Sequence, residues 1–173
     1  MMRRVAIFLL LNGLLAIGQG WHNNFDEPLS FKCLAGQSIS SIRSEHSNYH
    51  EDRHWDLSCK RTNKPNAECH QSAYVNDFDK AFTFECPENY AIAGMSSYHS
   101  NYHEDRRWQF YCCKVVCASG DRACQWTTYV NTFDEYFHWN VPPHSVLVGA
   151  ESYHQNYQED RRWRYKYCVK PCL

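Results

Sequence analysis

The chain is organised around residues 47–55, which read SNYHEDRHW. The pattern returns at 100–108 as SNYHEDRRW and, in looser form, at 155–163 as QNYQEDRRW, so successive copies start 53 and 55 residues apart. Recurrence at a nearly constant spacing indicates one supersecondary unit that cannot bury its apolar face alone. We divide the chain into repeat one (about 21–69), repeat two (about 70–124) and repeat three (about 125–173).

Residues 1–20 have the features of a secretory signal peptide. Two arginines precede an apolar run at 5–17, and small residues follow that run. The run is shorter than the roughly 18 apolar residues of a membrane span, and no later stretch approaches that length. We therefore expect residues 21–173 to form a single secreted, extracellular domain without a transmembrane segment.

The charge balance argues against a nucleic-acid partner. The chain has 18 Lys and Arg against 19 Asp and Glu, and removal of the predicted signal peptide takes away two of the arginines. A nucleic-acid-binding domain needs a clustered basic face. The mature chain is instead expected to be mildly acidic.

Ten cysteines in a secreted chain of this length predict five disulfides. In repeats one and two, cysteines 26 residues apart bracket the motif, and repeat three lacks both of them. Because partners are expected to disappear together, we predict the bridges Cys33–Cys59 and Cys86–Cys112.

Position alone does not fully pair the other six cysteines. The arrangement that treats repeats two and three alike is Cys69–Cys113, Cys124–Cys168 and Cys117–Cys172. A zinc site at the Cys113-x3-Cys117 spacing is not expected in an oxidising compartment.

Each repeat contains three segments with strand patterns. In repeat two they are residues 81–86, 90–95 and 108–112, which alternate in polarity or are rich in aromatic and β-branched residues. Turn formers separate them, and no segment has a convincing helical period. The sequence therefore predicts a disulfide-rich, all-β domain whose three repeats share one core.

The motif tryptophans, Trp55, Trp108 and Trp163, have the same strand parity as the bracketing cysteines, so we expect them in the core. The arginines two residues earlier share that parity. A buried arginine needs a carboxylate partner, which here is Asp52, Asp105, Asp160 or a nearby glutamate. A structural salt bridge is therefore one interpretation of the Asp-Arg pairs.

The other interpretation is that each motif forms an exposed carbohydrate-binding loop. Sugars need planar hydrogen-bonding groups and an aromatic ring on which to stack, and a loop held by a disulfide loses little entropy on binding. The candidate ligand-binding residues are Asn48, Tyr49, Glu51, Asp52 and Arg53 in repeat one, Asn101, Tyr102, Glu104, Asp105 and Arg106 in repeat two, and Asn156, Tyr157, Glu159, Asp160 and Arg161 in repeat three.

Neither a metal centre nor an active site is expected. His46, His50 and Glu51 have the spacing of zinc ligands, but that spacing presumes a helix, and repeat three carries Gln158 in place of the second histidine. Glu51 and Asp52 are adjacent on a predicted surface loop, which seldom supplies paired catalytic carboxylates. We therefore expect no metal, no cofactor and no enzymatic activity.

The Asp-Arg-x-Trp segments at 52–55, 105–113 and 160–163 resemble the Asp-Arg-x-Trp-x-Phe repeats of the dermatopontin family, and the ten-cysteine layout is similar. The resemblance covers essentially the whole predicted mature chain. Dermatopontins are extracellular-matrix proteins, which implies proteoglycan, collagen and growth-factor partners. The chain lacks a Tyr-rich acidic N-terminal extension, and this difference favours an agglutinin over a matrix protein.

A second similarity concerns architecture. Residues 86–94 read Cys-Pro-x-x-Tyr-x-Ile-x-Gly and precede an acidic loop and Phe-x-Cys at 110–112, as in vitelline-membrane outer-layer proteins. That resemblance implies a three-fold pseudo-symmetric, β-prism-like domain. A β-trefoil is the alternative for three antiparallel repeats.

Two functions compete at this point. One is a multivalent, lectin-like agglutinin that binds cell-surface glycans in cell aggregation or defence. The other is a matrix protein that binds proteoglycan, glycosaminoglycan or collagen. Five arginines supply a predicted basic patch for such partners: Arg106, Arg107, Arg161, Arg162 and Arg164. The mild acidity of the chain favours the first. The oligomeric state stays open, a homo-oligomer included.

Overall fold

The computed structural model describes residues 20–62, 64–115 and 123–169, and within these ranges the fold is all-β, as predicted. No helix occurs in the described ranges, and so none there is long and apolar enough to cross a membrane. The predicted signal peptide lies outside the described residues except for Gly20.

Each repeat contributes a short strand followed by a long hairpin. The strands are β1 (Leu29–Lys32), β2 (Gln37–Ser47), β3 (Asp52–Arg61), β4 (Cys69–Gln71), β5 (Phe82–Glu85), β6 (Tyr90–Ser100), β7 (Asp105–Lys114), β8 (Cys124–Trp126), β9 (Phe137–Asn140), β10 (Ser145–Gln155) and β11 (Asp160–Val169). The hairpin strands have 10 or 11 residues and run further toward the turn than the sequence predicts.

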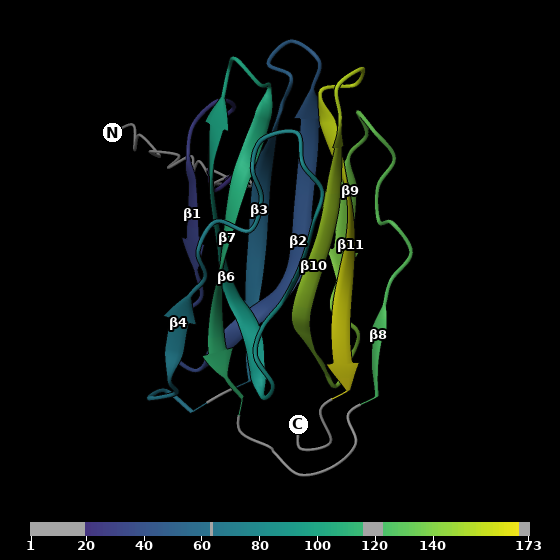
Figure 1. Cartoon of the computed structure of the whole chain (residues 1–173). Helices are drawn as coiled ribbons and strands as arrows, with labels where there is room; N and C mark the ends of the chain where they lie inside the picture. The colour runs from purple at the N-terminus through teal and green to yellow at the C-terminus, as the bar shows by residue number, and fades with distance from the viewer. Residues whose placement is uncertain (1–19, 63, 116–122, 170–173) are drawn as a thin grey trace, which may run out of the picture.

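The sheets form by exchange of strands between repeats. Hairpin β6–β7 pairs with β1 of repeat one, hairpin β10–β11 with β5 of repeat two, and hairpin β2–β3 with β9 of repeat three. Strands β4 and β8 complete the first two of these sheets. The long hairpins run side by side along the molecule (Figure 1). Since no repeat completes its own sheet, the repeats stabilise one another.

The three motif tryptophans form the centre of the core. Trp55, Trp108 and Trp163 are at most 1% exposed. Their rings meet pairwise edge to face, with centroids 5.0, 5.2 and 4.8 Å apart and interplanar angles of 77° to 80°. This is the arrangement that aromatic quadrupoles prefer. The prediction of a shared tryptophan core is confirmed.

A β-bulge recurs in the first strand of every hairpin, between Ile39 and Ser41, between Ile92 and Gly94, and between Leu147 and Gly149. In two of the three hairpins, the short strand lies very close to the residue that follows the bulge. A Cβ atom built on Gly94 would lie 2.5 Å from the carbonyl oxygen of Phe31 on β1, and one on Gly149 would lie 2.8 Å from that of Phe84 on β5. Glycine is therefore required where β1 and β5 join.

We expect Gly94→Val to lower the free energy of unfolding by about 1–3 kcal/mol, because β1 must move away to admit the side chain. Chemical denaturation measures this loss. Ser41→Ala at the corresponding position of repeat one is the control and should change little. An unchanged denaturation midpoint for Gly94→Val would contradict the close approach of β1.

Four predicted disulfides are present. Cys33–Cys59 and Cys86–Cys112 each span 26 residues, and Cys69–Cys113 and Cys124–Cys168 each span 44. Cys112 and Cys113 serve different bridges, as expected for neighbours on a strand whose side chains point to opposite faces. The predicted bridge Cys117–Cys172 falls on residues outside the described ranges.

Candidate functional site

The repeated motif forms the tight turns of the three hairpins, and all three turns lie at the same end of the molecule (upper end of Figure 1). In repeat one, the backbone N–H of His50 donates to Ser47 O at 3.1 Å, and the last turn residue, Glu51, has a φ of 45°. Glu104 and Glu159 have φ values of 43° and 44°. A glutamate in the left-handed region in every repeat is unusual, since this conformation normally favours glycine, and such strain tends to cluster at functional sites.

The turn tips expose three tyrosines almost completely. Tyr49, Tyr102 and Tyr157 have 89%, 90% and 88% of their surface exposed, and the preceding asparagines are also exposed. The rings of Tyr49 and Tyr102 stand edge-on to the neighbouring histidines, His50 and His103, with centroids 4.9 Å apart. Three aromatic rings thus face solvent at one end of the molecule.

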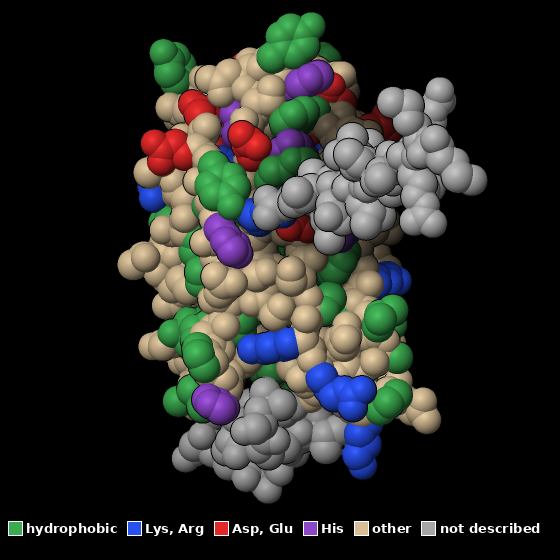
Figure 2. Space-filling view, turned by 180° about the vertical axis from the view of Figure 1, so that it is seen from behind, with side chains coloured by type: hydrophobic (Ala, Val, Ile, Leu, Met, Phe, Trp, Pro, Cys, Tyr) green, Lys and Arg blue, Asp and Glu red, His purple; other side chains and the backbone are tan. Residues whose placement is uncertain are grey.

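The turn glutamates line one pocket between the hairpins. Glu51, Glu104 and Glu159 line a small cavity of about 20 Å³, partly open to solvent, together with the tryptophans and the motif Asp-Arg pairs. Burial raises the pKa of the Glu104 and Glu159 carboxyls, the charges of His99 and His154 oppose the rise, and neighbouring carboxylates add to it. Figure 2 shows acidic and histidine side chains gathered at this end. The pocket mouth is therefore lined by acidic side chains that lie close to one another.

The motif aspartates and arginines form a closed set of buried ion pairs. Arg53 Nε and Nη2 donate to Asp160 at 2.6 and 2.7 Å, Arg106 donates to Asp52 at 2.6 and 2.6 Å, and Arg161 donates to Asp105 at 2.6 and 2.7 Å. All six residues are 3–4% exposed. Each arginine thus joins its hairpin to the hairpin of another repeat through a bidentate pair, the strongest geometry for these groups.

These contacts correct one expectation. The motif does not form one exposed loop, because the strands begin again at the aspartate. Asn and Tyr are exposed at the tips and Glu lies at the pocket mouth, whereas six predicted ligand residues are buried in ion pairs: Asp52, Arg53, Asp105, Arg106, Asp160 and Arg161. The salt-bridge interpretation is confirmed for these six, and each arginine pairs with the motif aspartate of another repeat.

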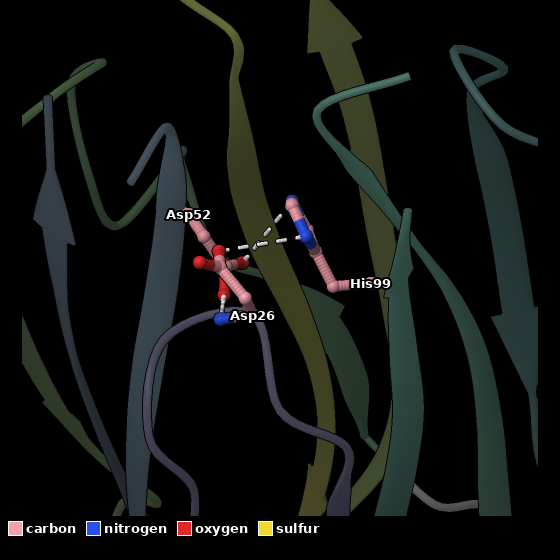
Figure 3. A group of neighbouring side chains, drawn as sticks. All are labelled: Asp26, Asp52 and His99. Atoms are coloured by element: carbon pink, nitrogen blue, oxygen red, sulfur yellow. Dashed lines mark hydrogen bonds and ion pairs between the residues drawn. The ribbon is translucent and has the colours of Figure 1, made fainter. Parts of the chain in front are cut away.

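Beside each ion pair, one buried histidine of one repeat lies among carboxylates that come partly from another repeat. We call each such group a seam. In the first seam, defined as Asp26, Asp52, His99 and Glu104, the His99 Nδ1 is 3.6 Å from Asp26 Oδ1, and its Nε2 is 3.6 Å from Glu104 Oε2 and 3.9 Å from Asp52 Oδ1. Figure 3 shows the imidazole of β6 facing the two aspartates of repeat one. The side chain of His99 is 0% exposed.

The second and third seams are built from the corresponding residues. The second seam is Asp79, Asp105, His154 and Glu159, and the third seam is Asp134, Asp160 and His46. Asp26, Asp79 and Asp134 all have φ values of 63° or 64°.

Sequence reasoning missed the first aspartate of each seam. The signal that could have found it is a second repeat, Asn-x-Phe-Asp, at 23–26, 76–79 and 131–134. Its asparagine accepts a hydrogen bond from the backbone N–H of the motif tryptophan at 2.8–2.9 Å. Its aspartate donates its own N–H to the motif aspartate at 2.8–2.9 Å. The Asn-x-Phe-Asp segment and the Asp-Arg-x-Trp segment of each repeat therefore form one structural unit.

The predicted basic patch does not form as a single surface. Arg106 and Arg161 are buried in the ion pairs described above. Arg107 pairs with Asp77 at 3.1 Å, and Arg164 pairs with Glu151 at 2.7 Å. The remaining arginine of the set, Arg162, packs over the ring of Tyr129.

Comparison with known proteins agrees with the residue-level resemblance. The dermatopontin family model matches residues 23–172. The chain is 44% identical to the hemagglutinin/amebocyte aggregation factor of Limulus polyphemus, over 99% of this chain and 100% of that protein. It is 42% identical to Millepora cytotoxin-1 of Millepora dichotoma, over 84% and 65% of the two chains, and 37% identical to the dermatopontin of Biomphalaria glabrata, over 82% and 95%. No solved structure gives a significant match. On the match across residues 23–172, the chain belongs to the dermatopontin family.

Proposed function

We propose that the chain is a secreted, non-enzymatic adhesion protein that agglutinates cells by binding glycans through its three tyrosine-tipped turns. The observation that carries this proposal is the near-complete exposure of Tyr49, Tyr102 and Tyr157 at one end of the molecule. An exposed ring offers a stacking surface for the apolar face of a sugar, and the adjacent asparagine and glutamate offer hydrogen-bonding groups.

The base of each turn supports this role. The strands on both sides of the turn are paired up to Ser47 and Asp52, and Asp52 is held by Arg106. A turn anchored in this way loses little conformational entropy on binding a ligand. Three weak sites on one chain then gain avidity through their high effective concentration.

The names of two relatives support agglutination and the matrix alternative respectively. The Limulus protein is named for hemagglutination and amebocyte aggregation, and the Biomphalaria protein is named dermatopontin. The acidic end that carries the tyrosines favours neutral or cationic glycans over sulfated glycosaminoglycans, which the glutamates would repel. Binding that weakens steeply with ionic strength would favour the matrix alternative.

The same proposal includes an architecture. We infer that the three sheets are the faces of a three-fold pseudo-symmetric β-prism rather than a β-trefoil. The exchange of strands from each repeat to the next, and the ion pairs that link each hairpin to another, support it. In such a prism the three turns surround one axis.

The test is the triple variant Tyr49→Ala, Tyr102→Ala and Tyr157→Ala. We expect single substitutions to weaken cell agglutination partially and the triple variant to raise the minimal agglutinating concentration at least about 100-fold, because avidity is lost with the sites. The fold should survive, since the rings are solvent-exposed.

Tyr136→Ala is the matched control, because Tyr136 is also exposed, at 52%, but lies outside the turns. A glycan array with the same proteins identifies the sugar. If the folded triple variant agglutinates cells at the wild-type concentration, the turns are not the binding surface.

A further inference from the structure

The imidazole of the first seam is buried without a hydrogen-bond partner. Neither ring nitrogen of His99 has one among the described residues, and neither has Asp26 Oδ1, although Nδ1 and Oδ1 face each other at 3.6 Å. Buried polar groups in native proteins are normally paired, and an exception calls for an explanation such as an ion. The first seam therefore presents a nitrogen and an oxygen of the kinds that bind metals, facing each other.

The charges of the first seam leave an excess of negative charge. Asp52 is neutralised, because both of its oxygens accept from Arg106 and one also accepts from the backbone N–H of Asp26. Asp26 and Glu104 have no such guanidinium partner in the described structure; the ion-pair contacts they make there are with the imidazoles of His50 and His99. These two carboxylates carry the formal charge that one divalent cation balances.

We propose that the first and second seams each bind a divalent cation of the Zn²⁺ class through an imidazole nitrogen and a carboxylate. In the first seam the ligands are His99 and Asp26, and Glu104 is on the other side of the ring. A carboxylate there accepts the second ring N–H and fixes the tautomer of a metal-bound histidine. A mixed nitrogen and oxygen ligand set suits zinc better than calcium or magnesium.

The distances fit this assignment. Zinc binds imidazole nitrogen and carboxylate oxygen at roughly 2.0–2.2 Å, so two ligand atoms of one tetrahedral ion lie about 3.4 Å apart. The two candidate atoms of the first seam are 3.6 Å apart, and those of the second seam, His154 Nδ1 and Asp79 Oδ1, are 3.7 Å apart. Small side-chain rotations would bring either pair onto an ion.

The third seam differs in two ways and serves as an internal comparison. Its imidazole nitrogen, His46 Nδ1, already contacts Asn48 Oδ1 at 3.1 Å. In the first and second seams a further histidine, His50 or His103, contacts the other oxygen of the aspartate at 3.1 and 3.4 Å, whereas repeat three has Gln158 at that position. We expect the third seam to bind more weakly.

The sequence-based expectation of no metal assumed that the ligands come from one repeat. The structure instead brings Asp26 of repeat one to His99 of repeat two, 73 positions further along the chain. When the ligands of a site come from different repeats, they are far apart in the sequence and form no short motif. The proposal does not depend on glycan binding.

The test is a titration of the metal-free, folded chain with Zn²⁺ by isothermal calorimetry. We expect two sites per chain with dissociation constants in the micromolar range or below. His99→Gln should remove one site, His154→Gln the other, and the double variant both, while His46→Gln and the exposed His138→Gln should keep two. Circular dichroism confirms the fold of each variant.

Absorption of the Co²⁺-loaded wild-type chain gives a measurement that needs no variant. Ligand-field bands that Zn²⁺ displaces at a stoichiometry of two support the proposal. No binding below 1 mM overturns it, as does a stoichiometry that His99→Gln and His154→Gln leave unchanged.

Discussion

Replacement of Arg106 by leucine is expected to lower the free energy of unfolding by about 3–5 kcal/mol, the cost of breaking a buried ion pair from one side. Arg106 donates two hydrogen bonds to Asp52, one to Ser97 Oγ at 3.1 Å and one to Glu27 O at 2.9 Å. The substitution leaves the Asp52 carboxylate 4% exposed and without its counter-charge. Denaturant unfolding followed by tryptophan fluorescence measures the loss.

Two further variants separate the charge from the packing. Arg107→Leu is the matched control, because its partner Asp77 is 81% exposed, and such pairs contribute at most about 1 kcal/mol. The double variant Arg106→Leu with Asp52→Leu should be more stable than Arg106→Leu alone, because no unpaired charge remains. If Arg106→Leu and Arg107→Leu lower the free energy of unfolding equally, the pair of Arg106 with Asp52 is not shielded from solvent, in contradiction to the structure.

Parity along the strand was enough to predict that the motif arginine and tryptophan point inward. Parity could not identify which of the three motif aspartates, or which nearby glutamate, pairs with a given arginine. Arg53 has Asp52 beside it in the sequence but pairs with Asp160, because β3 and β11 belong to different sheets whose inner faces meet in the assembled domain. Contacts of this kind depend on the assembled sheets, which no local pattern encodes.

The boundary of the turn was misjudged for a related reason. The segment from 48 to 53 is polar and charged, so it reads as a surface loop, yet β3 begins at Asp52. In the sequence alone, charged residues that pair with one another in the core look the same as charged residues on the surface. The same reason hid Asp26, which lies outside every strand and gains its role only beside His99 of the next repeat.

The disulfide pairs were predictable because two cysteines vanish together from repeat three. Their positions in the structure also explain why they matter. Cys33 follows β1, which belongs to the sheet of repeat two, and Cys59 lies on β3 in the sheet of repeat one. Cys86 and Cys112 link two sheets in the same way. These bridges fasten the exchanged strands, whose pairings are short.

Full reduction is therefore expected to unfold the chain and abolish agglutination. In the chain-entropy model, bridges that span 26 and 44 residues each contribute about 3.5–4 kcal/mol. Four such contributions reach or exceed the roughly 5–15 kcal/mol of net stability of a typical domain. The measurement is near-ultraviolet circular dichroism in excess dithiothreitol, which reports the packing of Trp55, Trp108 and Trp163. If the tryptophan signal persists with all thiols free, the ion pairs and the tryptophan core hold the repeats together without the bridges, and the exchanged strands need no covalent fastening.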